Sequence, residues 1–229
     1  MYASPLRRHA FVWLSADAHL RDAVTCEPPD APIVSQWIDA RRPLVVRRQP
    51  STCRNGGVAL GIASTPETGK RRIGVEVRRD AIDHIAPPPA LRSVARSAPP
   101  HARVQVAALC AAAEAASLDM RVFGSFAWET LTGLAYVTAA SDLDVLWQPR
   151  RAADIDAGIA LLEKWERTGG MRVDGEIVLG DDHAVAWREW STSGTRMLVK
   201  RLHDVQLREP AELLALLERA PSTTSEALP

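Results

Sequence analysis

The chain has 229 residues, of which 46% are hydrophobic, so it is long enough for one large domain or two small ones and too apolar to be disordered throughout. Its 28 basic and 28 acidic residues balance overall, but residues 1–100 carry 15 Lys and Arg with 9 Asp and Glu, whereas residues 101–229 carry 13 and 19. This asymmetry predicts a basic part that meets an anionic partner and an acidic part that holds a metal, although chance variation of the surface would give the same numbers.

Cysteine usage and hydropathy exclude several classes of protein. Cys26, Cys53 and Cys110 are scattered and form no Cys-x-x-Cys pair, so neither a disulfide framework nor a zinc site is expected. No apolar stretch is long enough to span a bilayer, and the apolar run that follows Arg8 is too short for a signal peptide. We therefore expect a cytoplasmic protein that binds neither membranes nor nucleic acid.

The first half has the pattern of a small β-rich domain over residues 1–95, with a proline-rich linker at about 87–101. The pattern predicts a strand at 9–14, short helices at 17–24 and 33–40, and further strands at 44–48, 58–62 and 72–77. Arginines concentrate between residues 41 and 79, and a few of them could bind phosphate bidentately. Arg47 and Arg48 point to opposite faces of their strand, so only one of them can face a given site, and Arg47 is the candidate.

The second half, residues 102–220, alternates between helical and strand patterns, and residues 221–229 read as a flexible tail. Helices are expected at 104–118, 126–134, 154–167 and 210–219, and strands at 121–123, 142–147, 172–179, 185–187 and 197–200. Lys200 ends one of these strands and is a candidate for contacting a phosphate.

Two short motifs in this half indicate which reaction the protein catalyses. Gly124-Ser125 follows an apolar strand and opens a helix, where backbone N–H groups can bind phosphate oxygens. Asp142 and Asp144 are two positions apart on a strand, so they share a face while Leu143 points into the core. Adjacent carboxylates repel each other unless a cation lies between them, and Mg²⁺ is commonly held by one or two carboxylates plus substrate phosphates. The pair of motifs predicts nucleotidyl or phosphoryl transfer.

These residues resemble the Gly-Ser and Asp-x-Asp signature of the DNA polymerase β-like nucleotidyltransferase superfamily. The fuller run GSFAWETLTGLAYVTAASDLDVLW resembles one branch, the phosphoribosyl-dephospho-CoA transferases of malonate decarboxylase, also called malonate decarboxylase holo-acyl-carrier-protein synthases. The runs RRPLVVRRQ, LGIASTPETGKRRIGVEV, VDGEIVL and AVAWREW are similar to the same family. The long gap between Ser125 and Asp142 departs from the wider superfamily and is typical of this branch.

The resemblance implies an α+β fold in which a small β-rich N-terminal domain precedes a nucleotidyltransferase-like mixed sheet with flanking helices. It also implies a third carboxylate on a neighbouring strand. Asp174 is the first candidate, as a ligand of a second metal or as the base that deprotonates the acceptor, and Glu176 on the same face is the alternative. Because Asp-Gly is a strong hairpin signal, Asp174-Gly175 could instead form a turn.

By the same resemblance, the donor is triphosphoribosyl-dephospho-CoA and the acceptor is a serine of the apo acyl-carrier subunit of malonate decarboxylase, with Mg²⁺ as cofactor and pyrophosphate as leaving group. Two alternatives remain at this stage. The signature could transfer a nucleotidyl group from ATP or another nucleotide to a different acceptor, or the chain could be a non-catalytic module that binds a carrier protein.

Overall fold

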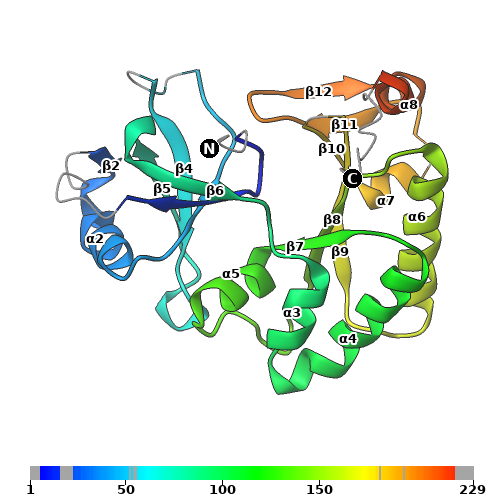
Figure 1. Ribbon diagram of the computed structural model, residues 1–229, viewed down its shortest axis with the longest axis horizontal. Helices are drawn as coiled ribbons and strands as arrows, with labels where there is room; N and C mark the ends of the chain where they lie inside the picture. The colour runs from blue at the N-terminus through cyan, green and yellow to red at the C-terminus, as the bar shows by residue number, and fades with distance from the viewer. Residues whose placement is uncertain are drawn as a thin grey trace, which may run out of the picture.

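The computed structural model describes residues 6–15, 23–51, 53, 56–180, 182–192 and 194–219, which form two six-stranded sheets with associated helices (Figure 1). The α+β fold class is confirmed. The helix expected from Asp17 lies almost entirely outside the described residues, and so does the segment 221–229. None of the helices in the described ranges combines the length and the hydrophobicity that crossing a membrane requires.

The first sheet is antiparallel throughout and has the strand order β2-β5-β4-β3-β1-β6. Side chains alternate along β5, so that Ile73, Val75 and Val77 are buried in the core shared with helix α2 while Arg72 and Glu76 lie on the other face. Its elements are β1 (Phe11–Leu14), β2 (Val24–Cys26), α2 (Ala31–Asp39), β3 (Leu44–Val46), β4 (Val58–Ala63), β5 (Arg72–Val77) and β6 (Ile82–Ala86).

The second sheet is mixed and has the order β12-β11-β10-β9-β8-β7. Its strands are β7 (Met120–Phe123), β8 (Leu143–Trp147), β9 (Val173–Leu179), β10 (His183–Ala186), β11 (Met197–Lys200) and β12 (Val205–Arg208). Its helices are α3 (Leu91–Ser97), α4 (Pro100–Ala115), α5 (Gly124–Thr132), α6 (Ala152–Arg167), α7 (Trp187–Ser191) and α8 (Pro210–Arg219).

Only β8 and β9 run parallel in this sheet, because α6 connects them as a crossover helix. Helices α3, α4 and α6 cover the face of the sheet that points away from the first half (Figure 1). Leu143, Val145 and Trp147 of β8 are buried in the core on that side, with Ile155 and Leu162 of α6. The opposite face of β8 and β9 is left for polar residues and looks toward the first sheet.

The two halves share a hydrophobic core. Trp128 of α5 packs edge-on against Phe11 of β1 and Trp37 of α2, with ring centroids 5.1 and 5.6 Å apart. Tyr136 belongs to the same cluster, and its hydroxyl donates a hydrogen bond of 2.7 Å to the carbonyl oxygen of Ala63 on β4. Trp128 is therefore a packing residue, and α5 is anchored on both sides.

Several elements have no clear pattern in the sequence. Strands β2, β6 and β12 and helix α7 are short, and α3 lies inside the proline-rich segment expected to be a linker. Pro99 ends α3 and Pro100 opens α4 at its first turn, where the missing N–H of proline costs nothing. The same prolines that indicate a break thus mark the border between two packed helices.

Candidate active site

The predicted aspartates lie on the open face of the second sheet. Register pairs Phe123 of β7 with Asp144 of β8, and Asp144 with Asp174 of β9, so these three residues form one row across the sheet. Asp144 and Asp174 are partly exposed, whereas Leu143 and Val145 beside Asp144 are fully buried on the helix-covered face. Asp144 therefore lies on the open face, as the alternation of side chains along the predicted strand requires.

Gly124 brings the start of α5 against the Asp144 carboxylate. Its φ of +66° lies in the left-handed region, and a Cβ at this position would lie 1.9 Å from Oδ2 of Asp144. Ser125 is the second residue of α5 and is partly exposed. The unpaired N–H groups of the first turn of α5 and the Asp144 carboxylate thus lie side by side, so phosphate oxygens and a cation can be bound together there.

The electrostatics of Asp144 would favour a cation beside its carboxylate. Burial, together with the negative charges of Asp142 and Asp174, raises the pKa of Asp144 to about 7, even though the charge of Arg72 on β5 acts to lower it. Asp142 immediately precedes β8 and is partly exposed. A carboxyl group with this pKa is only partly ionised at neutral pH unless a positive charge is added beside it.

Mg²⁺ fits this donor set, because it prefers oxygen ligands and is usually bound by one or two carboxylates with the remaining positions taken by phosphate and water. In the ranges that the structure describes, no three His, Cys, Asp or Glu side chains are arranged so that they could hold a metal ion alone. The aspartates therefore match a metal that arrives with the phosphates of a substrate better than a closed metal site built only from protein ligands.

Asp174 is the second residue of β9 and pairs with Asp144 in the ladder, so Asp174-Gly175 is part of a strand and the alternative of a hairpin turn is wrong. The N–H of Gly175 donates a hydrogen bond of 2.8 Å to Oδ1 of Asp174, which fixes the direction of the carboxylate. A Cβ on Gly175 would lie 2.0 Å from the carbonyl oxygen of Val145, so glycine lets β9 run close against β8. That close approach keeps Asp174 next to Asp144.

Glu176 has a different environment, although it shares the face of Asp174. Its Oε1 accepts hydrogen bonds from Arg8 Nη2 (3.2 Å) and Lys200 Nζ (3.0 Å), and its Oε2 lies 3.0 Å from Nε2 of His9. Burial raises the pKa of Glu176, but the hydrogen bond from His9 and the positive charges of Arg8 and Lys200 outweigh this effect and hold the pKa well below its usual range. Both oxygens already have basic partners, so Glu176 is less suited than Asp174 to bind a metal.

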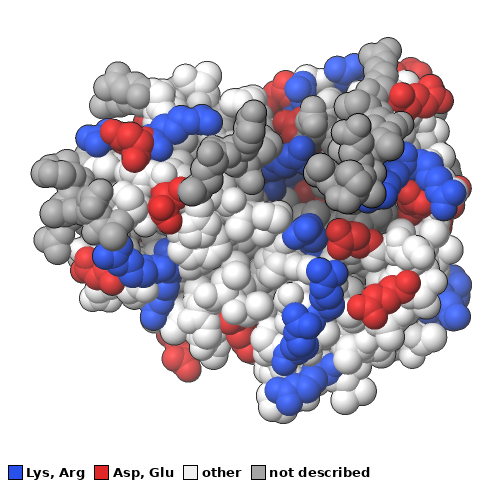
Figure 2. Space-filling model, in the orientation of Figure 1, with Lys and Arg blue, Asp and Glu red and all other residues white. Residues whose placement is uncertain are grey.

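Arg47 follows β3 and lies on the outer face of the first sheet. Its side chain runs across the cross-strand glycine pair Gly61 and Gly74, since a Cβ on Gly74 would lie 2.1 Å from Nη1 of Arg47. Arg72 is two positions before Gly74, on the same face of β5, and its charge acts on Asp144. Of these two arginines, Arg72 is therefore the one whose charge reaches the aspartates, whereas Arg47 lies over the glycine pair of the first sheet. Figure 2 shows a hollow between the two halves with basic side chains on its wall.

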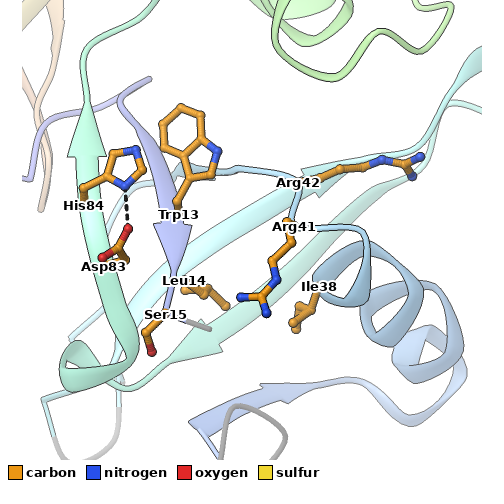
Figure 3. Close-up of a pocket in the computed structure, with 8 residues that line it drawn as sticks. All are labelled: Trp13, Leu14, Ser15, Ile38, Arg41, Arg42, Asp83 and His84. Atoms are coloured by element: carbon orange, nitrogen blue, oxygen red, sulfur yellow. Dashed lines mark hydrogen bonds and ion pairs between the residues drawn. The ribbon is translucent and has the colours of Figure 1, made fainter. Parts of the chain in front are cut away.

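A separate surface cavity of about 270 Å³ contains none of the predicted site residues. It lies at the far end of β1 from His9, where the rings of Trp13 and His84 stack and Arg41 points in from the end of α2 (Figure 3). The aspartate face, and not this cavity, is therefore the candidate active site.

The sequence did not single out Arg8, His9 or Arg72 as site residues. His9 and Glu176 are 167 positions apart, and Arg72 is one of many arginines in the first half. A charged pair at the start of a predicted strand is a common surface feature, so no local signal distinguishes Arg8 and His9. Their role depends on how the first half packs on the second sheet.

Two family models match the chain. The one described as phosphoribosyl-dephospho-CoA transferase MdcG N-terminal domain matches residues 7–88, and the one described as the MdcG C-terminal domain matches residues 90–211. No solved structure gives a significant match.

Curated relatives agree with the family models. One from Xanthomonas euvesicatoria pv. vesicatoria is 40% identical over 213 residues, which are 93% of this chain and 99% of the relative. One from Xanthomonas campestris pv. campestris strain 8004 is 41% identical over 194 residues, 85% of this chain and 90% of the relative. One from Bradyrhizobium diazoefficiens is 35% identical over 216 residues, 92% and 93% of the two chains.

All three relatives are named phosphoribosyl-dephospho-CoA transferase. The matches run over nearly the full length of this chain and of the relatives. The Gly124-Ser125 and Asp142-Leu143-Asp144 motifs lie within residues 90–211, which the C-terminal family model matches. The resemblance seen in the sequence is confirmed: the chain belongs to the phosphoribosyl-dephospho-CoA transferase family and is an enzyme, a transferase.

Proposed function

We propose that this enzyme transfers phosphoribosyl-dephospho-CoA from triphosphoribosyl-dephospho-CoA to a serine hydroxyl of the apo acyl-carrier subunit of malonate decarboxylase. A bond forms between the serine oxygen and the innermost phosphorus of the triphosphate, and the bond from that phosphorus to pyrophosphate breaks. The names of the relatives support the transferred group. The carrier and the triphosphate follow from the resemblance of the sequence motifs.

The observation that carries this proposal is the contact between the Asp144 carboxylate and Gly124 at the start of α5, with Asp142 and Asp174 close enough to raise the pKa of Asp144. This arrangement places a group of carboxylates that needs a cation beside backbone N–H groups that bind phosphate oxygens. A triphosphate with its Mg²⁺ supplies both of the missing partners.

Each predicted residue then has a role. Asp142 and Asp144 would hold Mg²⁺ with Asp174 as a third ligand, and Mg²⁺, when bound, would neutralise the charge of the triphosphate. Gly124 gives the phosphates close access to the backbone, and Ser125 donates a hydrogen bond to them. Lys200 is paired with Glu176 but its side chain is 39% exposed, so it keeps donors for a phosphate, as does Arg47 on the opposite wall.

The test is mass spectrometry of the apo carrier after incubation with the enzyme, Mg²⁺ and triphosphoribosyl-dephospho-CoA. We expect a mass gain equal to one phosphoribosyl-dephospho-CoA group, and no gain when EDTA is added. No gain with a carrier that is competent for modification would contradict the proposal. A gain of a nucleotidyl group from ATP would instead assign a different donor.

Asp142→Asn and Asp144→Asn test the site in the same assay. Each removes one carboxylate from the group, so we expect transfer to fall by at least about 1,000-fold while the fold is kept, as for a lost electrostatic contact to the transition state. Asp39→Asn, on the exposed surface of α2, is the matched control and should transfer normally. Normal transfer by either active-site variant would remove the aspartates from the mechanism.

A further inference from the structure

His9 belongs to the first half of the chain, yet its ring lies on the second sheet. The imidazole stacks on Phe123 of β7, with ring centroids 4.0 Å apart and 29° between the planes, while its Nε2 reaches Glu176 of β9. The ring therefore spans from β7 to β9 on the face that carries Asp144 and Asp174. Phe123 directly precedes Gly124 and is the register partner of Asp144, so His9 borders the group of aspartates.

The hydrogen bond to Glu176 fixes the tautomer of His9. An ionised carboxylate can only accept, so at 3.0 Å from Oε2 the Nε2 atom must carry a proton. Nδ1 is then the unprotonated nitrogen of the neutral ring, and it has no hydrogen-bond partner among the described residues. His9 thus has the arrangement of a base whose second nitrogen is oriented by a carboxylate.

Glu176 is suited to stabilise a positive charge on this ring. Glu176 is 5% exposed, and its two oxygens are held by Arg8 Nη2 at 3.2 Å, Lys200 Nζ at 3.0 Å and His9 Nε2 at 3.0 Å. Arg8 Nη2 also lies 3.3 Å from Nε2 of His9, and its charge opposes that of a protonated ring. Glu176 offsets this repulsion, and Arg8 and Lys200 in turn balance the charge of Glu176, so these three side chains keep His9 in place.

The backbone of His9 is also unusual. Its φ of +64° is in the left-handed region, which costs a non-glycine residue about 1 kcal/mol or more. Glycine would take this conformation freely, so a histidine is present at a position where the backbone conformation favours glycine. The stacking, the hydrogen bond and the backbone conformation all hold one ring at one place.

We propose that His9 is the general base of the transfer reaction, supplied by the first half of the chain to the active site on the second sheet. The proposal rests on the proposed function above. As the acceptor serine oxygen forms its bond to phosphorus and the bond to pyrophosphate breaks, the serine proton passes to Nδ1 of His9. Nε2 keeps its proton and its hydrogen bond to Glu176, whose negative charge stabilises the imidazolium. The proton leaves to solvent after the pyrophosphate has departed.

The experiment compares two histidines in the transfer assay. His9→Gly removes the ring, suits a φ of +64° and leaves a space between Phe123 and Glu176 that free imidazole can enter. His84→Gly is the matched control. His84 also stacks on an aromatic ring, Trp13 at 4.6 Å, and pairs with a carboxylate, Asp83 at 2.8 Å (Figure 3), but it lines the separate cavity that contains none of the predicted site residues. His9→Gln keeps a side chain in the space. It therefore shows whether a loss of activity in His9→Gly comes from a folding defect or from the loss of the imidazole.

We expect both His9 variants to lose about 100- to 10,000-fold in the transfer rate at saturating donor, with the KM for the donor changed by less than about twofold. Added imidazole should raise the rate of His9→Gly at least about tenfold in a saturable manner, and should change neither His9→Gln nor His84→Gly. His84→Gly alone should transfer at the wild-type rate.

A merely structural role for His9 predicts a raised KM, a lowered melting temperature and no rescue by imidazole, and that result would overturn the proposal. Normal transfer by His9→Gln would do the same. If the wild-type enzyme itself does not modify the carrier, both the proposed function and the role of His9 fall. Wild-type transfer with unaffected His9 variants removes only the role of His9.

Discussion

At the scale of single residues, the surroundings of Asp144 disfavour the ionised carboxylate on which the proposed site depends. Its carboxyl group is largely buried beside two other aspartates, and its pKa is raised to about 7 in the folded chain, against about 4 for an unfolded aspartate. Between these two values the folded state holds a proton that the unfolded state has released. The free energy of unfolding therefore falls as the pH rises from about 4 to about 7, and the loss is complete above pH 7.

Asp144→Asn removes this loss. In the absence of metal we expect the variant to be more stable than wild type by roughly 2 kcal/mol at pH 8, and by almost nothing at pH 4, since asparagine carries no charge at either pH. Urea unfolding with EDTA at the two pH values measures the difference. Asp39→Asn should leave the pH dependence as in wild type, and an equal or lower stability of Asp144→Asn at pH 8 would contradict the prediction.

Gly124→Ala tests the close approach of α5 to Asp144. A Cβ would meet Oδ2 at 1.9 Å and would also face the unfavourable φ of +66°, so Asp144 must move. We expect transfer to fall at least about 100-fold, as for other sub-ångström displacements of catalytic groups. Gly133→Ala provides the control, because Gly133 has a φ of +69° with nothing within 4 Å of the added Cβ. It should cost about 1 kcal/mol of stability and leave transfer intact.

At the scale of elements, the parallel pair β8 and β9 places Asp144 and Asp174 side by side. Gly175 is the residue that lets the two strands approach, since its Cβ would meet the backbone oxygen of Val145 at 2.0 Å. Gly175→Ala should lower the free energy of unfolding by about 3 kcal/mol, because neither backbone can yield without breaking the ladder between the strands. Gly194→Ala, whose Cβ would lie 3.4 Å from its nearest neighbour, should stay within about 1 kcal/mol of wild type in the same urea titration. Equal losses in the two variants would show that the strand contact is not tight.

How far the sequence predicts these elements depends on whether their signal is local. Alternation of Leu143, Asp144 and Val145, and the apolar stripe of α6, predict β8 and α6 correctly, because one buried face per element leaves a periodic pattern. The short elements β2 and α7 bury too few residues to leave one. Asp174 and Glu176 cannot be separated by spacing, since they share a face of β9. What separates them is the set of basic groups from Arg8, His9 and Lys200, which come from other strands or segments.

At the scale of the whole molecule, Glu176 connects the two halves. Its pKa is held below that of an unfolded glutamate, so its contribution to stability is fully present above about pH 4.3 and is lost as the pH falls through the lower folded value. Glu176→Gln leaves Arg8 and Lys200 without their partner and should cost about 3 kcal/mol at pH 7. As the pH falls to 3, wild type should lose more stability than the variant does. Guanidinium unfolding at both pH values, with the exposed Glu67→Gln as control, measures this, and parallel losses in wild type and Glu176→Gln would contradict it.

The core that Trp128 and Tyr136 share with Phe11 and Trp37 also limits how such a gene can be divided. The family models divide the chain at residue 89, but polypeptides made separately from the two matched parts would each expose one side of that core as an apolar surface. We expect each part made alone to aggregate, and the two parts made in the same cell to associate through this core as a heterodimer. The chemistry would then need both halves but not the peptide bond that links them.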